Sequence, residues 1–190
     1  YGGSFLHWLI TEHPRPYESW GNGAAMRVSP VGLAFSTEKE VLAEAEKSAA
    51  ITHNHPEGIK GAQATALAVF MARTGQGKTA IRSRIQEQFG YDLARTVDQI
   101  RPDYSFDISC QGTVPEAIIA FLDARSYEDA VRNAVSLGGD SDTLACITGG
   151  IAEAYYRQVP ESVVERARAL LPPDLLTILD HFTRAFPVAP

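Results

Sequence analysis

Apolar residues recur every three or four positions along nearly the whole chain, and this period is the feature that most constrains the fold. Ile81, Ile85 and Phe89 follow one another at four-residue intervals, and Gly90 then ends the run, as glycine commonly does at a helix C-terminus. Few windows alternate with period two, so strands are expected to contribute little. We therefore predict an all-α domain, a bundle of helices with functional loops.

Capping residues indicate where several of the helices begin. Thr37 and Glu40 have the form of a capping box, which predicts a helix that starts at position 38. Ser126 predicts the start of another helix, which Gly138 ends. The segment 113–116, Thr-Val-Pro-Glu, combines a cap, an early proline and a box glutamate, so it also predicts a helix start. Further predicted helices cover residues 61–73, 160–171 and 173–186, and one runs from the turn at 138–143 through Tyr155.

The size and charge of the chain exclude several classes of partner. With 190 residues, of which 45% are hydrophobic, the chain can bury one sizeable core, so residues 1–190 are predicted to form a single domain. The formal net charge is −6 and no run of Lys or Arg occurs, so no nucleic-acid partner is expected. No apolar stretch approaches the roughly 20 residues of a membrane span, so no membrane partner is expected either.

The cysteine usage predicts a reducing compartment. Cys110 and Cys146 are the two cysteines of the chain, and their spacing fits no metal site. We expect both to be small buried residues. Because no signal peptide opens the chain, we predict a cytoplasmic protein.

The segment 138–143, Gly-Gly-Asp-Ser-Asp-Thr, places two carboxylates and a hydroxyl on a glycine turn before an alanine-rich helix. Hard oxygen donors at this density are typical of a divalent cation site, and Mg²⁺ would relieve the repulsion between Asp140 and Asp142. Alternatively, Asp or Thr simply caps the helix. A phosphatase-type Asp-x-Asp-x-Thr motif is excluded, because Thr143 follows Asp142 directly and no predicted strand precedes Asp140.

Two further loops are dense in groups that bind ligands. In the segment 19–27, Ser-Trp-Gly-Asn-Gly-Ala-Ala-Met-Arg, the glycines beside Asn22 would let a ligand approach the backbone closely, although Asn-Gly is also a common turn dipeptide. In the segment 52–58, His53 and His55 could ligate a transition metal, but no third soft ligand is evident. We interpret these histidines as ligand-binding or turn residues.

The segment 72–79, Ala-Arg-Thr-Gly-Gln-Gly-Lys-Thr, fits a relaxed phosphate-loop pattern in which Ala replaces the first Gly. A phosphate loop needs a buried strand before it, whereas residues 62–71 have helical composition. The favoured alternative is a turn between two helices, with Lys78 exposed.

Three motifs stand in a fixed order along the chain: the segment from Ser19 to Arg27, then Thr52-His53, then the segment 139–143 followed by an alanine-rich helix. In this order and with helices between them, the motifs resemble the ADP-ribosylglycohydrolase family. The stretches 106–117 and 152–156 also look like sequence of that family. The resemblance covers nearly all of the chain, and it implies the family's compact orthogonal multi-helix bundle.

The resemblance also implies a reaction and a set of roles. The chain would hydrolyse the glycosidic bond between ADP-ribose and a modified protein side chain or small acceptor, so its partner would be an ADP-ribosylated protein or an ADP-ribose derivative. Asp140, Asp142 and Thr143 would ligate a binuclear Mg²⁺ centre, and metals held in this way would orient ribose hydroxyls and activate water. The implied substrate-binding residues are Ser19, Gly21, Asn22, Gly23 and His53, of which His53 would face the ribose or diphosphate.

Two acidic elements of the family are not found in this sequence. Family members place a Gly-Asp element and a Thr/Ser-Asp-Asp-Thr element before the Gly-Asn-Gly loop, whereas the 190 residues contain no Asp-Asp pair. The expected catalytic acid would lie upstream of Tyr1, so no catalytic residue is assigned.

We expect an N-terminally truncated domain, the C-terminal two thirds of the family domain, whose site an N-terminal fragment or a second chain completes. The alternative is a non-catalytic, crystallin-like or ADP-ribose-binding relative that has lost half of the metal site. Mg²⁺ prefers near-octahedral oxygen coordination, so we expect weak or incomplete metal occupancy in this chain alone.

Overall fold

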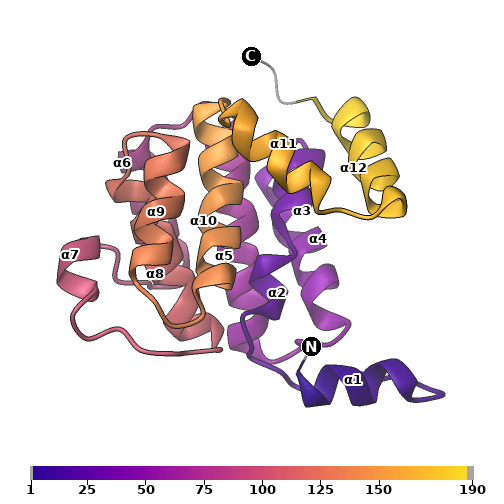
Figure 1. Ribbon diagram of the computed structural model, residues 1–190. Coiled ribbons are helices and arrows are strands. Elements are labelled where there is room, and N and C mark those ends of the chain that lie inside the picture. The colour runs from indigo at the N-terminus through magenta and orange to yellow at the C-terminus, as the bar shows by residue number, and fades with distance from the viewer. Residues whose placement is uncertain (1, 188–190) are drawn as a thin grey trace.

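The computed structural model describes residues 2–187, and helices form almost all of the regular structure (Figure 1). Within these residues the only extended pairing is an isolated antiparallel bridge between Gly21 and Ser109. The prediction of an all-α fold is confirmed. The helices are α1 (Gly3–Ile10), α2 (Gly23–Met26), α3 (Ser29–Ala34), α4 (Glu38–Ala50), α5 (Pro56–Arg73), α6 (Lys78–Phe89), α7 (Val97–Ile100), α8 (Cys110–Asp123), α9 (Tyr127–Ser136), α10 (Ser141–Tyr156), α11 (Glu161–Ala169) and α12 (Pro173–Ala185).

Helix α5 lies at the centre of the bundle. Figure 1 shows it between two groups of helices, with α8, α9 and α10 on one side and α2, α3 and α4 on the other. Ala62 and Ala66 of α5 belong to the apolar cluster on the α4 side, whereas Ala64 and Ala68 belong to the larger cluster that includes α6, α8 and α10. All four alanines are fully buried. These short side chains let helices on both sides approach α5 closely.

Several local signals in the sequence act as predicted. Thr37 and Glu40 form both hydrogen bonds of the capping box at the start of α4. The Ser126 hydroxyl accepts the Asp129 N–H at the start of α9, and Gly90 ends α6 in the left-handed conformation, with φ +68°. The C-terminal helices α11 and α12 also lie within the predicted ranges, and neither contains a buried residue.

Two helices begin earlier than predicted. Helix α5 starts at Pro56 rather than position 61, because the His55 side chain accepts the Glu57 N–H at 3.1 Å and so caps the helix. Helix α8 starts at Cys110, where the Ser109 hydroxyl accepts the Gly112 N–H at 3.0 Å. Pro115 therefore lies inside α8, and the prediction of a helix start at 113–116 is wrong.

The turn between α5 and α6 contains the phosphate-loop pattern, and a helix rather than a strand precedes it. The turn was predicted correctly, but Lys78 is not exposed. Its Nζ donates to the carbonyl oxygens of Leu122 and Ala124 at the end of α8, and it lies 4.9 Å from the centroid of the Phe121 ring. Lys78 therefore stabilises the junction of α6 and α8.

The two cysteines differ in exposure. Cys110 is buried at the start of α8, as predicted, whereas Cys146 is exposed on α10, so the expectation that both are buried is wrong. Both are free thiols. In the range 2–187, no helix has both the length and the apolar character needed to cross a membrane.

Candidate functional site

A cleft of about 1070 Å³ opens beside the N-terminal end of α10. Every residue that the sequence predicted to contact substrate or metal lines this cleft. These residues are Ser19, Gly21, Asn22, Gly23, His53, Asp140, Asp142 and Thr143. The fold therefore brings together segments that the sequence keeps far apart, while the individual roles of these residues stay predictions.

The acidic turn enters the cleft through two successive left-handed glycines. Gly138 has φ +75° and Gly139 has φ +60°, and residues with a Cβ adopt this backbone conformation only at a cost in free energy. A Cβ on Gly139 would also lie 2.9 Å from the carbonyl oxygen of Ser105. The glycines therefore let the chain turn sharply from α9 into α10 and place Asp140 at the position before the helix.

The Asp140 side chain does not cap α10, although the residue occupies the N-cap position. Its Oδ2 instead accepts a hydrogen bond of 2.6 Å from Nδ2 of Asn22. The same Nδ2 donates to the Thr113 hydroxyl at 3.0 Å. The amide nitrogen of Asn22 is thus engaged within the protein, so Asn22 orients a carboxylate of the acidic turn.

The loop that carries Asn22 is itself fixed by the segment before α8. The Asn22 N–H donates to the Ile108 carbonyl at 2.7 Å, and the Cys110 N–H donates to the Trp20 carbonyl at 2.8 Å. These two bonds flank the isolated bridge between Gly21 and Ser109. The Gly-Asn-Gly loop therefore has a defined backbone position in the cleft wall.

Asp140 and Asp142 share their environment at the start of α10. Burial raises the pKa of Asp140, whereas a hydrogen bond from Asp140 lowers the pKa of Asp142. Oδ1 of Asp142 also accepts the Thr143 N–H at 2.9 Å. Like charges this close in sequence and space repel each other, and a cation that bound both carboxylates would relieve that repulsion.

His53 projects from the loop between α4 and α5. Its Nδ1 lies 2.6 Å from the Thr52 hydroxyl oxygen, and its Nε2 faces the Gly-Asn-Gly loop. A Cβ would lie 3.4 Å from Nε2 if it were added to Gly21, and 3.3 Å from Nε2 if it were added to Gly23. The absence of side chains at these two positions therefore leaves room for the imidazole ring. Burial and, to a smaller extent, the positive charge of Arg27 lower the pKa of His53 to about 4.

His55 does not join His53 in the cleft. Besides capping α5, it meets the Trp20 ring edge-on, with centroids 5.5 Å apart. The two histidines therefore do not form a metal site together, in keeping with their interpretation as ligand-binding or turn residues.

Sequence reasoning missed several residues of the cleft wall, among them Glu18, Phe106 and Ile108. Glu18 adds a third carboxylate to the cleft. Its backbone adopts the left-handed conformation, with φ +54°, and its N–H donates a hydrogen bond to Oδ1 of Asn54 at 2.7 Å. The side chains of Phe106 and Ile108 are exposed, which makes one edge of the cleft apolar. Phe106 could have been found, because it opens the family-like stretch 106–117. No pattern in the sequence indicates Glu18.

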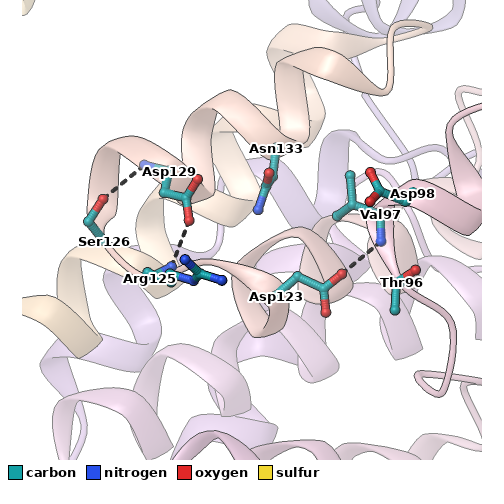
Figure 2. Close-up of a pocket in the computed structure, with 8 residues that line it drawn as sticks. All are labelled: Thr96, Val97, Asp98, Asp123, Arg125, Ser126, Asp129 and Asn133. Carbon is teal, nitrogen blue, oxygen red and sulfur yellow. Dashed lines mark hydrogen bonds between the residues drawn. The ribbon is translucent and has the colours of Figure 1, made fainter.

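A second cleft, of about 600 Å³, lies where α7, α8 and α9 meet (Figure 2). Its three carboxylates already have partners, and Asp98 forms an ion pair with Arg101. Asp123 accepts the Val97 N–H at 2.7 Å, and Asp129 accepts the Arg125 N–H at 2.8 Å. None of the predicted site residues lines this cleft, so the one beside α10 is the better candidate.

Comparison with known proteins agrees with this assignment. Residues 3–188 match the sequence model of the family described as ADP-ribosylglycohydrolase. The chain belongs to the ADP-ribosylglycohydrolase family. The match includes all residues of the cleft that were predicted from the motifs, and it confirms the resemblance on which their roles were based.

Individual relatives in the ADP-ribosylglycohydrolase family are about 30% identical to the chain over the aligned region. ADP-ribosylhydrolase ARH3 of Homo sapiens is 32% identical to the chain over an alignment 193 positions long. This alignment covers 76% of this chain and 53% of that protein. ADP-ribosyl-[dinitrogen reductase] glycohydrolase of Rhodospirillum rubrum is 28% identical over 164 residues, which cover 80% of this chain and 51% of that protein. The chain thus spans about half the length of the curated relatives it matches.

A solved structure confirms the fold of the ADP-ribosylglycohydrolase family for this chain. The structure of an "ADP-ribosylglycohydrolase-related protein complex" superposes with a TM-score of 0.65 at 30% sequence identity. The superposition covers 80% of this chain and 56% of that chain. The predicted bundle of the ADP-ribosylglycohydrolase type is therefore correct.

Proposed function

We propose that this chain takes part in hydrolysis of the glycosidic bond between ADP-ribose and an acceptor, with Mg²⁺ held by Asp140, Asp142 and Thr143. The proposal rests on one observation: these three residues, the Gly-Asn-Gly loop and His53 all line the same cleft. The family and the names of the relatives support an ADP-ribosyl group as the part of the substrate that is released. The acceptor is an ADP-ribosylated protein side chain or a small molecule.

The donor set of the cleft fits Mg²⁺. Two carboxylates and one hydroxyl are hard oxygen ligands, and Asn22 already holds one carboxylate oxygen in place. When bound, Mg²⁺ would supply a positive charge that orients ribose hydroxyls and activates water. Among residues 2–187, however, no group of three or more His, Cys, Asp or Glu could hold a metal ion. The further ligands, and the acid that activates water, would come from an N-terminal segment or a second chain.

The reaction replaces one bond to the anomeric carbon of the ribose with another. The oxygen of water bonds to that carbon, the bond from the carbon to the acceptor nitrogen or oxygen breaks, and the acceptor leaves with a proton. In this chain, the glycines at 21 and 23 would let the nucleotide approach the backbone, and His53 would contact a ribose or diphosphate oxygen. The exposed apolar side chains of Phe106 and Ile108 would border the bound nucleotide.

A titration with Mg²⁺ and ADP-ribose tests the binding part of the proposal. Calorimetry on the chain should show ADP-ribose binding that strengthens with Mg²⁺, and Asp140→Asn or Asp142→Asn should remove the Mg²⁺ dependence. Asp98→Asn is the matched control, because Asp98 is an exposed carboxylate outside this cleft. Metal-independent binding that survives in Asp140→Asn would contradict the assigned ligands. Tight binding of two Mg²⁺ ions by this chain alone would contradict the incomplete site.

Release of ADP-ribose tests the hydrolytic part. Peptides modified on arginine or serine would be incubated with the chain, with and without Mg²⁺, beside a version that carries the acidic elements of the family. We expect release only from the completed version. Binding without release in both versions would favour a non-catalytic ADP-ribose-binding protein.

A further inference from the structure

Arg27, Thr52 and His53 form a chain of hydrogen bonds at the wall of the cleft. Arg27 follows α2, and its Nη2 donates to the Thr52 hydroxyl oxygen at 3.0 Å and to the Ser48 carbonyl at 2.9 Å. The Thr52 hydroxyl oxygen in turn lies 2.6 Å from Nδ1 of His53. Thr52 is 1% exposed, so water has almost no access to its hydroxyl. The Thr52 hydroxyl must therefore find its hydrogen-bond partners within the protein.

The donor and the acceptor in each of these hydrogen bonds follow from the hydrogens that Arg27, Thr52 and His53 carry. A guanidinium group has donors only, so Thr52 accepts from Arg27. The single hydroxyl hydrogen of Thr52 then needs an acceptor, and Nδ1 of His53 is the one that the described residues place within hydrogen-bond distance. The other tautomer, with a proton on Nδ1, would leave a buried hydroxyl hydrogen without a partner. Nδ1 is therefore the acceptor, and the proton of the neutral ring lies on Nε2.

The charges around His53 keep the ring neutral at pH 7. Burial and the Arg27 guanidinium disfavour the imidazolium form, and the pKa of His53 lies at about 4. Tyr17, whose ring centroid lies 6.1 Å from that of His53, has a pKa that burial raises. Neither neighbour offers a negative charge that would stabilise a second proton on the ring.

The Nε2 edge of His53 is left for a ligand. Among the described residues Nε2 has no hydrogen-bond partner, and it lies beside Gly21 and Gly23 in the cleft wall. An Nε2–H group donates a hydrogen bond and cannot accept one. The atom that it meets in the cleft must therefore be an acceptor.

We propose that Arg27 and Thr52 are positioning residues that fix His53 as the Nε2–H tautomer, so that this point of the cleft selects a ligand oxygen that accepts a hydrogen bond. A diphosphate or ribose oxygen has this chemistry, and the identification of that ligand rests on the proposed function. The tautomer does not rest on it, because it follows from contacts within the protein.

Nitrogen NMR of the ligand-free chain tests the proposal directly. In the full chain labelled with ¹⁵N-histidine at pH 7, long-range ¹H–¹⁵N correlations report which ring nitrogen carries the proton. His53 should show a bare Nδ1 and a protonated Nε2, and His53→Gln assigns its signals. His55 is an internal control, because its Nδ1 accepts the Glu57 N–H and does not involve Thr52. A protonated Nδ1 in wild-type His53 would overturn the proposal, and this measurement needs no variant.

Two substitutions of Thr52 separate positioning from packing. Thr52→Val removes the hydroxyl and should give a mixture of His53 tautomers, while Thr52→Ser keeps the hydroxyl and should give the wild-type spectrum. His55 should be unchanged in both. Arg27→Met should also give a mixture, because the Thr52 hydroxyl is then free to accept from Nδ1. An unchanged His53 spectrum in Thr52→Val would contradict the role of Thr52.

ADP-ribose titrations of the same proteins distinguish this proposal from the proposed function. Thr52→Val should weaken ADP-ribose binding in proportion to the fraction of His53 that leaves the Nε2–H tautomer, about twofold for an equal mixture, and Thr52→Ser should restore it. If the wild-type chain has the Nε2–H tautomer but binds no ADP-ribose, the proposed ligand is wrong and the role of Arg27 and Thr52 stands. If it binds ADP-ribose and Thr52→Val binds equally tightly, the selection by Nε2–H is wrong.

Discussion

Lys78 offers the sharpest test of whether the sequence around it binds phosphate or only joins two helices. We expect the substitution Lys78→Met to destabilise the protein and to leave nucleotide binding unaffected. Methionine keeps an apolar stem of similar length, so the change removes mainly the ammonium group. The ammonium group donates to the carbonyls of Leu122 and Ala124 at the end of α8.

The size of the effect follows from the contacts that are lost. A hydrogen bond from a charged donor to the Leu122 carbonyl is worth about 1.5–3 kcal/mol. The ammonium group also lies 4.9, 5.8 and 5.4 Å from the ring centroids of Phe121, Tyr155 and Tyr156, worth about 0.5–2 kcal/mol in total. The Ala124 carbonyl keeps a bond from the Tyr156 hydroxyl, and removal of the half-buried charge recovers part of its desolvation cost. We therefore expect a net loss of about 2 kcal/mol in the free energy of unfolding.

Urea unfolding at pH 7 measures this loss, and thermal unfolding should show a decrease of roughly 4–8 °C in Tm. Lys47→Met is the matched control, because the Lys47 side chain is 71% exposed and pairs only with Glu44. Its expected loss is below about 0.5 kcal/mol. If Lys78→Met unfolds like the wild type, or if it abolishes binding of a nucleoside triphosphate, the assignment of Lys78 to the helix junction is refuted.

Three further predictions concern the cleft. Asn22→Ala removes the hydrogen bond to Asp140, so it should lower the free energy of unfolding, measured in urea, by about 1.5–3 kcal/mol. It should also weaken Mg²⁺ binding, which calorimetry measures. An unchanged Mg²⁺ affinity would show that Asp140 needs no orientation by Asn22. Because the folded pKa of His53, about 4, lies below the ordinary 6.5, the unfolded chain binds the proton more readily between these values. Stability should therefore fall as pH decreases from 6.5 toward 4, by up to about 1.4 kcal/mol per pH unit, and His53→Gln should lose this dependence; an equal slope in the variant would argue against a buried neutral ring. Gly23→Ala would place a Cβ 3.3 Å from Nε2 of His53, so it should shift the ring slightly and weaken ADP-ribose binding by at most about tenfold, the loss of one hydrogen bond. Gly77→Ala, where a Cβ meets nothing within 4 Å, should bind like the wild type.

Helix content could be predicted from the sequence because its signals are local. The capping box at Thr37 and the left-handed Gly90 depend on residues a few positions away, and both behave as expected. The start of α8 could not be chosen in this way, because Ser109 and Thr113 are both good capping residues. The choice depends on the distant Trp20, whose carbonyl accepts the Cys110 N–H, and on Asn22, which donates to the Thr113 hydroxyl.

The candidate site likewise combines features that local sequence predicts with features that depend on contacts between distant segments. Motifs identified the residues that line the cleft, but the connections between them depend on the fold. Asn22 was predicted to bind substrate, a role that stays a prediction, and the structure adds that its Nδ2 donates to Asp140. Lys78 was expected to be exposed, whereas the end of α8 occupies its donors. Pairings between distant segments carry no periodic signal, so the sequence alone could not reveal them.

The bond between Asn22 and Asp140 joins residues that are 118 positions apart in the sequence. Closing so long a loop costs chain entropy that grows with the logarithm of its length, and almost all of the bundle must fold before the two groups can meet. The acidic turn is therefore expected to gain its orientation late in folding. A ligand that binds this cleft would recognise only fully folded chains, so its binding would also measure how many molecules have folded.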